Sequence, residues 1–120
     1  MYYTYRARCL NVVDGDTADL EVDLGFHLKA THRFRLLGID TPEIHAKDPA
    51  QRERAQAAKT RLVDLLAPDE RGGFTLRITT SKADSFGRWL ADVMNGDAIE
   101  TVSEILLREG HAVAYFGGAK

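Results

Sequence analysis

The feature that most constrains the fold is one long amphipathic helix placed between two runs of strand-like sequence. Residues 48–68 carry apolar side chains at helical spacing, and Asp48 followed by Pro49 is a typical helix start. Pro68 ends the helical pattern. The predicted apolar side consists of Ala55, Ala58, Leu62, Leu65 and Leu66. Because such a helix must bury its apolar side, it is predicted to pack on a sheet formed by the strands.

Alternating apolar and polar residues predict three strands before this helix and two after it. The predicted ranges are 2–13, 17–22, 28–39, 74–80 and 89–94. A second, shorter helix is predicted from a capping box, Thr101 with Glu104, to a C-terminal glycine, Gly110. A parallel sheet would need helices alternating with single strands. The order therefore favours an α+β, mainly β fold, a five-stranded Greek-key barrel of the OB type with two helices packed on it.

The length of 120 residues fits a single domain spanning residues 1–120. No apolar run is long enough to span a membrane and the N-terminus has no secretion signal, so a cytoplasmic protein is expected. The protein is also expected to be a monomer. Cys9 is the single cysteine, which rules out an internal disulfide and a cysteine-based metal site. The net charge of −2 argues against binding of nucleic acid through phosphates, unless a cation completes the site.

Three polar clusters stand at the ends of predicted strands: DGDT at 14–17, RLLGIDTPE at 35–43 and DSFGR at 84–88. In a small barrel, strand ends and loops can converge on one site while the core fixes their positions. Asp16, Asp40 and Glu43 would offer hard oxygen ligands for Ca²⁺ or Mg²⁺, whereas Arg35 and Arg88 would offer permanently charged forks. Carboxylates with arginines indicate phosphoryl chemistry, because a pentacoordinate phosphorus carries more negative charge than the ground-state diester.

With VVDGDT and FRLLGIDTPE ahead of the long helix and FGR after it, the chain resembles the staphylococcal nuclease (thermonuclease-like) family over residues 12–115. The resemblance implies an OB-fold, metal-dependent nuclease that hydrolyses phosphodiester bonds of DNA and RNA. It implies little sequence preference, 3′-phosphate products, and Ca²⁺ as cofactor with Mg²⁺ less favoured. The chain stops soon after its second helix, and in this it is similar to compact bacterial or phage-encoded forms.

The resemblance also implies roles for individual residues. Asp16 and Asp40 resemble the family's metal-binding carboxylates, and the backbone carbonyl of Thr41 resembles a further ligand. Arg35 and Arg88 resemble the two arginines that hold the scissile phosphate.

Glu43 resembles the residue that activates or orients the attacking water, and the sequence leaves open which of the two it does. Pro42 restricts the backbone on both of its sides, so Asp40 and Glu43 are predicted to lie in a defined arrangement near one cation. Such rigid placement is what a water-activating carboxylate needs.

The substrate-binding residues depart from the family's pattern. Before the Gly-Arg pair the family commonly has a lysine and a tyrosine, whereas this chain has Ser85 and Phe86. Weaker binding of the terminal phosphate is therefore expected. Phe86 and Tyr115 are predicted to stack on bases, while Trp89 is expected to be a packed core aromatic.

Each cluster also has an ordinary structural interpretation. Asp14 and Asp16 around Gly15 are common turn residues, and an arginine such as Arg35 often pairs with a surface acid. All the motifs together, in this order, favour the nuclease. The main alternative is a catalytically silent nucleic-acid or protein-binding module on the same barrel, because a fold can persist after its site is lost.

Overall fold

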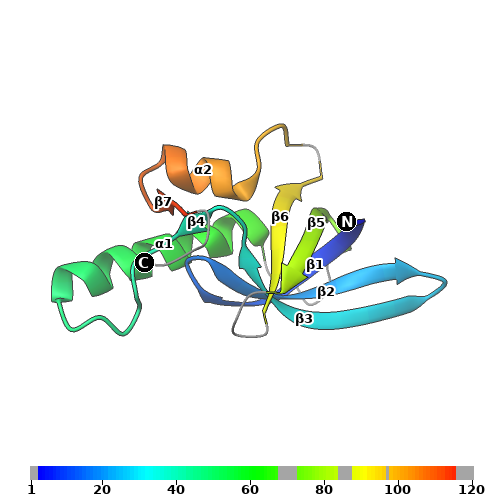
Figure 1. Ribbon diagram of the computed structural model, residues 1–120, viewed down its shortest axis with the longest axis horizontal. Coiled ribbons are helices and arrows are strands. Elements are labelled where there is room, and N and C mark those ends of the chain that lie inside the picture. The colour runs from blue at the N-terminus through cyan, green and yellow to red at the C-terminus, as the bar shows by residue number, and fades with distance from the viewer. Residues whose placement is uncertain (1–2, 68–72, 84–87, 97, 116–120) are drawn as a thin grey trace.

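The computed structural model describes residues 3–67, 73–83, 88–96 and 98–115, which form a five-stranded closed barrel with two helices packed on it (Figure 1). The barrel strands are β1 (Tyr3–Asp14), β2 (Thr17–Gly25), β3 (Leu28–Leu36), β5 (Leu76–Ala83) and β6 (Trp89–Asn95). The helices are α1 (Pro49–Leu66) and α2 (Val102–Arg108), and the short strands β4 (Ile39–Asp40) and β7 (Val113–Ala114) form a separate pair. The predicted mainly β barrel with two helices is confirmed.

The barrel order is β1-β2-β3-β6-β5, so strands that are distant in sequence become neighbours. Its closure joins β3 to β6 in parallel, with Phe34 opposite Trp89, whereas the other barrel neighbours are antiparallel. Inward-facing apolar residues from all five strands fill the interior. They include Ala7, Cys9, Leu20, Phe34, Ile78 and Val93.

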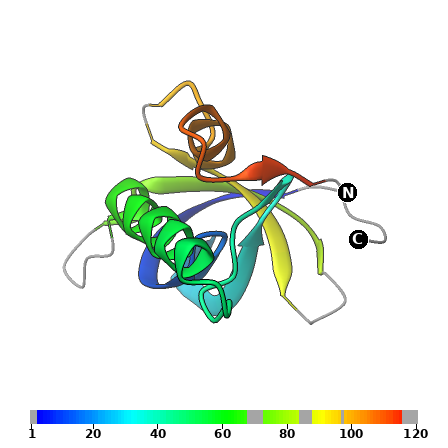
Figure 2. The same cartoon turned by 90° about the vertical axis from the view of Figure 1, so that its left-hand side faces the viewer.

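Helix α1 forms where local sequence signals predict it. The Asp48 side chain accepts a hydrogen bond from the Ala50 backbone N–H at 3.1 Å, with Pro49 at the first helical position. The predicted apolar stripe is buried against the barrel. Its buried residues are Ala55, Ala58, Leu62, Leu65 and Leu66. Figures 1 and 2 show α1 and α2 together on one side of the molecule, away from the long β2–β3 hairpin.

Helix α2 carries the predicted capping box, in which the Glu104 N–H donates to the Thr101 hydroxyl and the Thr101 N–H donates to the Glu104 carboxylate. The predicted C-terminal glycine, Gly110, has φ +82°, a left-handed conformation that glycine adopts readily. A two-bond ion pair between Arg61 and Glu109, at 2.6 and 2.9 Å, connects α1 with the end of α2.

Several strand boundaries differ from the predicted ones; β2, for example, runs to Gly25 rather than to residue 22. The segment predicted as one strand from 28 to 39 is interrupted after Leu36, and Gly38 has φ +84°. The chain therefore turns out of the barrel before Asp40, and Ile39 and Asp40 pair with β7 instead. Strand β5 continues to Ala83, beyond the predicted end at residue 80. Trp89, expected in the core, is 41% exposed at the start of β6.

Candidate active site

The DGDT turn between β1 and β2 packs closely against the rest of the site. A Cβ atom added at Gly15 would lie 2.8 Å from the Ala58 Cβ of α1 and 2.9 Å from the Thr41 hydroxyl oxygen. Glycine alone fits between them without displacement. Gly15 therefore allows the turn, the helix and the segment after β4 to meet, which its character as a turn signal did not reveal.

Asp16 is buried, with 7% of its surface exposed, and its carboxylate is held from two sides. The Thr17 hydroxyl donates to Oδ1 at 3.0 Å, and the Thr41 backbone N–H donates to Oδ2 at 3.2 Å. The second bond spans 25 positions of sequence, so it ties the DGDT turn to the Asp40-Thr41 segment. The backbone carbonyl of Thr41 was predicted to be a metal ligand, whereas the contact that the structure describes is the hydrogen bond from the Thr41 N–H to Asp16.

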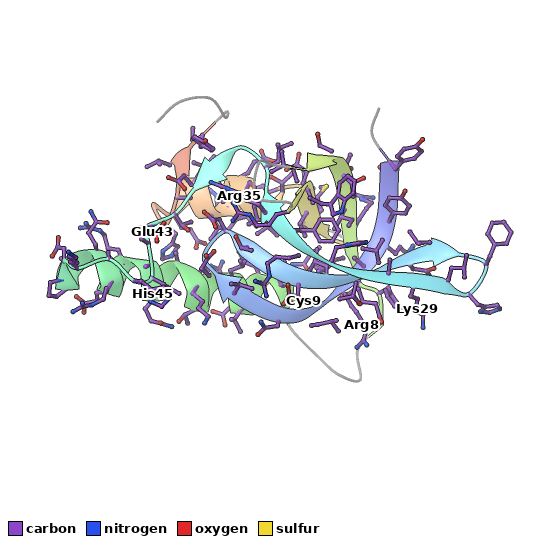
Figure 3. All side chains as sticks on the ribbon, turned by 60° about the horizontal axis from the view of Figure 1, so that its bottom comes forward. Arg8, Cys9, Lys29, Arg35, Glu43 and His45 are labelled. Carbon is purple, nitrogen blue, oxygen red and sulfur yellow. The ribbon has the colours of Figure 1, made fainter. Side chains whose placement is uncertain are left out.

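Arg35, labelled in Figure 3, contacts the carboxylates of both Asp16 and Asp40. Although only 9% exposed, its guanidinium donates from Nη1 to the Ile39 carbonyl and from Nη2 to the Asp40 carboxylate, each at 3.1 Å. The same Nη2 lies 3.8 Å from the Asp16 Oδ2. Two of the predicted metal-binding carboxylates thus approach one guanidinium nitrogen. This is strong charge compensation for a buried arginine.

Arg88 approaches the cluster from the start of β6, where this strand pairs with β3. Its Nη1 lies 3.4 Å from the Thr17 hydroxyl, which in turn donates to Asp16. The parallel pairing of β3 with β6 makes this possible, because it brings the start of β6 alongside the end of β3 that carries Arg35. Thr17 therefore lies between the two predicted phosphate-binding arginines. The sequence indicated a role for Thr17 only through its membership of the DGDT motif.

Tyr115 reaches the site through the β4–β7 pair. Its backbone N–H donates to the Gly38 carbonyl at 2.9 Å, and its ring centroid lies 5.2 Å from the Arg35 guanidinium carbon. The structure thus brings Tyr115 beside Arg35, while its predicted stacking on a base stays a prediction. Short strands of two residues leave little periodicity to read, so the sequence did not predict this pairing.

Glu43 lies on the loop that leads from β4 to α1, and Figure 3 shows it with His45 to one side of Arg35. Its side chain is exposed, and its backbone carbonyl accepts from the Ala46 N–H at 3.2 Å. The carboxylate of Glu43 is therefore open to solvent. The predicted substrate contacts Ser85 and Phe86 lie outside the described residues.

The pKa values of the two carboxyl groups of the DGDT turn are shifted in opposite directions. Burial, together with the neighbouring charge of Asp16, raises the pKa of Asp14 to about 6. Burial works in the same direction on the pKa of Asp16, but the hydrogen bond shared with Asp14 and the charge of Arg35 outweigh it and lower that pKa. Asp16 is therefore ionised at neutral pH, a requirement for a cation ligand.

The donor chemistry of the cluster suits a hard cation, since Asp16 and Asp40 offer only oxygen atoms. Within the residues that the structure describes, no group of three or more acidic, histidine or cysteine side chains is arranged to hold a metal ion. Two carboxylates close together, with solvent on one side, would leave other ligand positions to water or substrate oxygens.

A small β-barrel with a carboxylate–arginine cluster at the ends of its strands defines a class of candidate phosphoryl-transfer proteins. Comparison with known sequences makes this specific. The family described as "Staphylococcal nuclease homologue" matches residues 33–120, and the chain belongs to this family. The match begins after the DGDT turn, so Asp16 joins the site through its contacts with Thr41 and Arg35.

The chain is also 30% identical, over 129 aligned positions, to an uncharacterized protein of the archaeon Methanocaldococcus jannaschii. The alignment covers 92% of this chain and 59% of that protein, so the chain spans little more than half the length of this relative. Among the described helices, neither has the length and apolar character that crossing a bilayer requires.

Proposed function

We propose that this protein is a metal-dependent nuclease that hydrolyses phosphodiester bonds of DNA or RNA with little sequence preference and leaves 3′-phosphate ends. The observation that carries the proposal is the placement of Arg35 and Arg88 on either side of the Thr17–Asp16 pair, with Asp40 bound to Arg35. Membership of the staphylococcal nuclease family supports it. We further propose that residues 1–120 act as a single domain.

Asp16 and Asp40, with the Thr41 carbonyl, are the residues that would hold the cation, and we propose Ca²⁺ in preference to Mg²⁺. Ca²⁺ accepts irregular oxygen sets with several waters, whereas Mg²⁺ demands near-octahedral geometry. Once bound, the cation would supply positive charge to a phosphate oxygen. Asp40 already accepts from Arg35 at 3.1 Å, so cation binding would require the guanidinium to share or release this carboxylate.

The arginines would act on the phosphate itself. A guanidinium that releases Asp40 can turn its fork to two phosphate oxygens, and Arg88 can contact the same group from the other side of Thr17. Because the charge on these oxygens increases in the transition state, both contacts strengthen there and accelerate the reaction. The exposed Glu43 carboxylate would orient a water, or take its proton, on the solvent side.

Substrate bases would meet the aromatic side chains around the cluster. Tyr115 already stacks near Arg35, and it is proposed to bind a base or sugar beside the scissile phosphate. Ser85 and Phe86 are retained as proposed substrate contacts.

The direct test is cleavage of a fluorescently labelled single-stranded DNA and of an RNA of the same sequence, each with Ca²⁺, with Mg²⁺ and with a chelator. Cleavage in Ca²⁺ that falls at least a hundredfold in Arg35→Ala is expected, since removal of one transition-state donor costs about 10²–10³ in rate. Arg54→Ala, an exposed substitution on α1, is the control and should cleave normally. No cleavage by a folded protein with any metal would reject the nuclease and favour the catalytically silent module.

A further inference from the structure

A segment of unusual charge leads into the site from the far end of the molecule. Residues 24–39 contain no aspartate or glutamate, although the chain as a whole has 18 acidic residues and a net charge of −2. The same residues include Lys29, Arg33 and Arg35, together with two histidines and two phenylalanines. Basic and aromatic residues in one segment are the combination that binds single-stranded nucleic acid.

This segment forms the tip of the β2–β3 hairpin and all of β3. The hairpin projects from the barrel on the side away from the helices (Figure 1), and it contributes to a longest dimension of 47 Å. Strand β3 pairs with β6 only from Phe34 to Leu36. Within the part of the chain that the structure describes, the edge of β3 from Leu28 to Arg33 therefore has no neighbouring strand on that side.

The outward side chains of β3 form a row that ends at the candidate active site. Phe34 and Leu36 lie in the core, so by the alternation of a strand Lys29, Arg33 and Arg35 share the opposite face. At about 3.3 Å per residue, Lys29 lies roughly 20 Å along the strand from Arg35. Figure 3 shows these two residues towards opposite ends of β3. Several nucleotides of an extended strand would be needed to cover this length.

Three carboxylates on the neighbouring strand β2, those of Asp19, Glu21 and Asp23, stand opposite this row in the strand register. Asp19 receives Nε and Nη2 of Arg33 at 2.9 and 3.3 Å, which holds that guanidinium in place and leaves Nη1 outside the pair. Glu21 receives Arg8 from β1 at 2.8 Å, and Asp23 accepts from the Gly25 N–H at 2.8 Å. Asp19 and Arg33 thus neutralise each other, whereas Asp23 keeps its charge opposite Lys29 in the strand register. A phosphate bound along β3 would have to compete with these two carboxylates for Arg33 and Lys29.

The hairpin tip exposes an aromatic ring at a conformational cost. Phe26 is 95% exposed, and its φ of +56° is followed by +62° at His27. Gly25 and Leu28 are the last paired residues, so Phe26 and His27 form a two-residue loop of the type I′ kind, which requires positive φ at both positions. Bulky side chains adopt this left-handed region less readily than glycine or asparagine, so the sequence places an aromatic ring at the tip at some cost. An exposed ring at the end of a basic strand is suited to stacking on a base.

We infer that the β2–β3 hairpin is a binding arm for single-stranded nucleic acid, in which Lys29 and Arg33 hold phosphates in line with Arg35 and Phe26 stacks on a base. The inference deepens the proposed function and rests on it, because the bound nucleic-acid strand is taken to run from the hairpin towards the proposed active site at Arg35. Single strands fit better than duplexes, because only unstacked bases offer their faces to Phe26. Phosphates several nucleotides from the scissile bond would thus contribute to affinity.

The competing explanation is that the same cations protect the exposed edge of β3. Lysine and other charges on an edge strand discourage pairing with a second chain. This explanation predicts that removal of the cations promotes self-association and leaves nucleic-acid affinity unchanged.

The test measures binding by fluorescence anisotropy in a chelator, where no cleavage is expected, with oligodeoxythymidines of about 4 and about 16 nucleotides. The double variant Lys29→Ala/Arg33→Ala is compared with Lys59→Ala/Arg108→Ala, which removes the same charge from the helices and also breaks an exposed ion pair, Arg108 with Glu100. Melting temperatures verify folding, and sedimentation gives the oligomeric state. Phe26→Ala is measured separately.

We expect the hairpin double variant to weaken binding of the long oligonucleotide about tenfold and to flatten its salt dependence, with less than a twofold effect on the short one. Phe26→Ala should weaken binding of the long oligonucleotide about fivefold. Equal losses in the helix control, or unchanged affinity with new dimers, would overturn the inference. Because binding is measured without cleavage, a protein that binds through the hairpin but never cuts would reject the nuclease alone.

Discussion

At the scale of single residues, the candidate site depends on contacts that bring three separate segments together. Asp16 accepts a hydrogen bond from the Thr41 N–H, while Arg35 donates to Asp40 and lies 3.8 Å from Asp16. The sequence named these side chains as a set, because each stands in a recognisable cluster. It did not reveal that Gly15 packs too closely against α1 and Thr41 to leave room for a side chain, since this depends on how far apart the segments pack.

Gly15→Ala is expected to destabilise the protein by about 1–3 kcal/mol, because the added methyl group would overlap Ala58 and Thr41. Urea unfolding measures the change. Gly73→Ala is the matched control, since nothing lies within 4 Å of a Cβ at that position, and it should leave the unfolding midpoint nearly unchanged. Equal effects of the two substitutions would contradict the close packing of the DGDT turn.

The pKa of about 6 at Asp14 predicts a pH dependence of stability. A carboxyl group whose pKa is higher in the folded state binds more protons there, so its contribution to the free energy of unfolding falls as pH rises from about 4 to above 6. Asp14→Asn removes this loss. In a chelator, the variant should gain roughly 1–2 kcal/mol relative to the wild type between pH 4.5 and 7.5, after allowance for partial exposure.

Asp19→Asn is the control for this pH series. Its ion pair with Arg33 lowers the pKa of Asp19, so the stability that this group contributes is lost only below about pH 4. The variant should therefore run parallel to the wild type between pH 4.5 and 7.5. If Asp14→Asn also ran parallel, the elevated pKa of Asp14 would be wrong.

At the scale of helices and strands, prediction succeeded where the signals are local. Asp48 with Pro49, and Thr101 with Glu104, mark helix starts through contacts within one turn, and both starts are confirmed. The interruption at Leu36 and the pairing of β4 with β7 depend instead on a partner segment more than 70 positions away. Alternation of apolar residues cannot indicate which partner a strand will find.

Thr101→Ala is expected to destabilise the protein by about 1 kcal/mol, since the Glu104 N–H would lose its side-chain partner. Thermal unfolding gives the comparison with Thr60→Ala, an exposed position inside α1 where alanine is the better helix former. That control should be neutral or slightly stabilising. A Thr101→Ala protein as stable as the wild type would mean that the capping box contributes nothing to folding.

At the scale of the whole molecule, the barrel connects stability to the proposed cation site. Asp16 and Asp40 come from segments that are distant in sequence, and both are held in place only when the barrel and the β4–β7 pair are formed. A cation bound by both therefore binds the folded state alone and stabilises all of it. The fold class followed from element order, while the roles of Asp16, Asp40 and Thr41 stay predictions.

Ca²⁺ is expected to raise the melting temperature, and the rise should grow with Ca²⁺ concentration. At a hundredfold excess over the dissociation constant, the free energy of unfolding should increase by about 2.7 kcal/mol. Asp40→Asn should abolish the response, whereas Asp64→Asn, an exposed acid on α1, should keep it. Scanning calorimetry at several Ca²⁺ concentrations would record this. A wild-type protein insensitive to Ca²⁺ would contradict the assignment of these carboxylates.

The exposed Trp89 at the barrel seam gives the protein an internal optical reporter. It is the only tryptophan, it stands opposite Phe34 where β3 meets β6, and its ring lies 6.3 Å from that of His32. This pairing joins residues distant in sequence, a slow step for a folding chain. The change in indole fluorescence during refolding should therefore follow closure of the barrel, the event that brings Arg88 to Arg35.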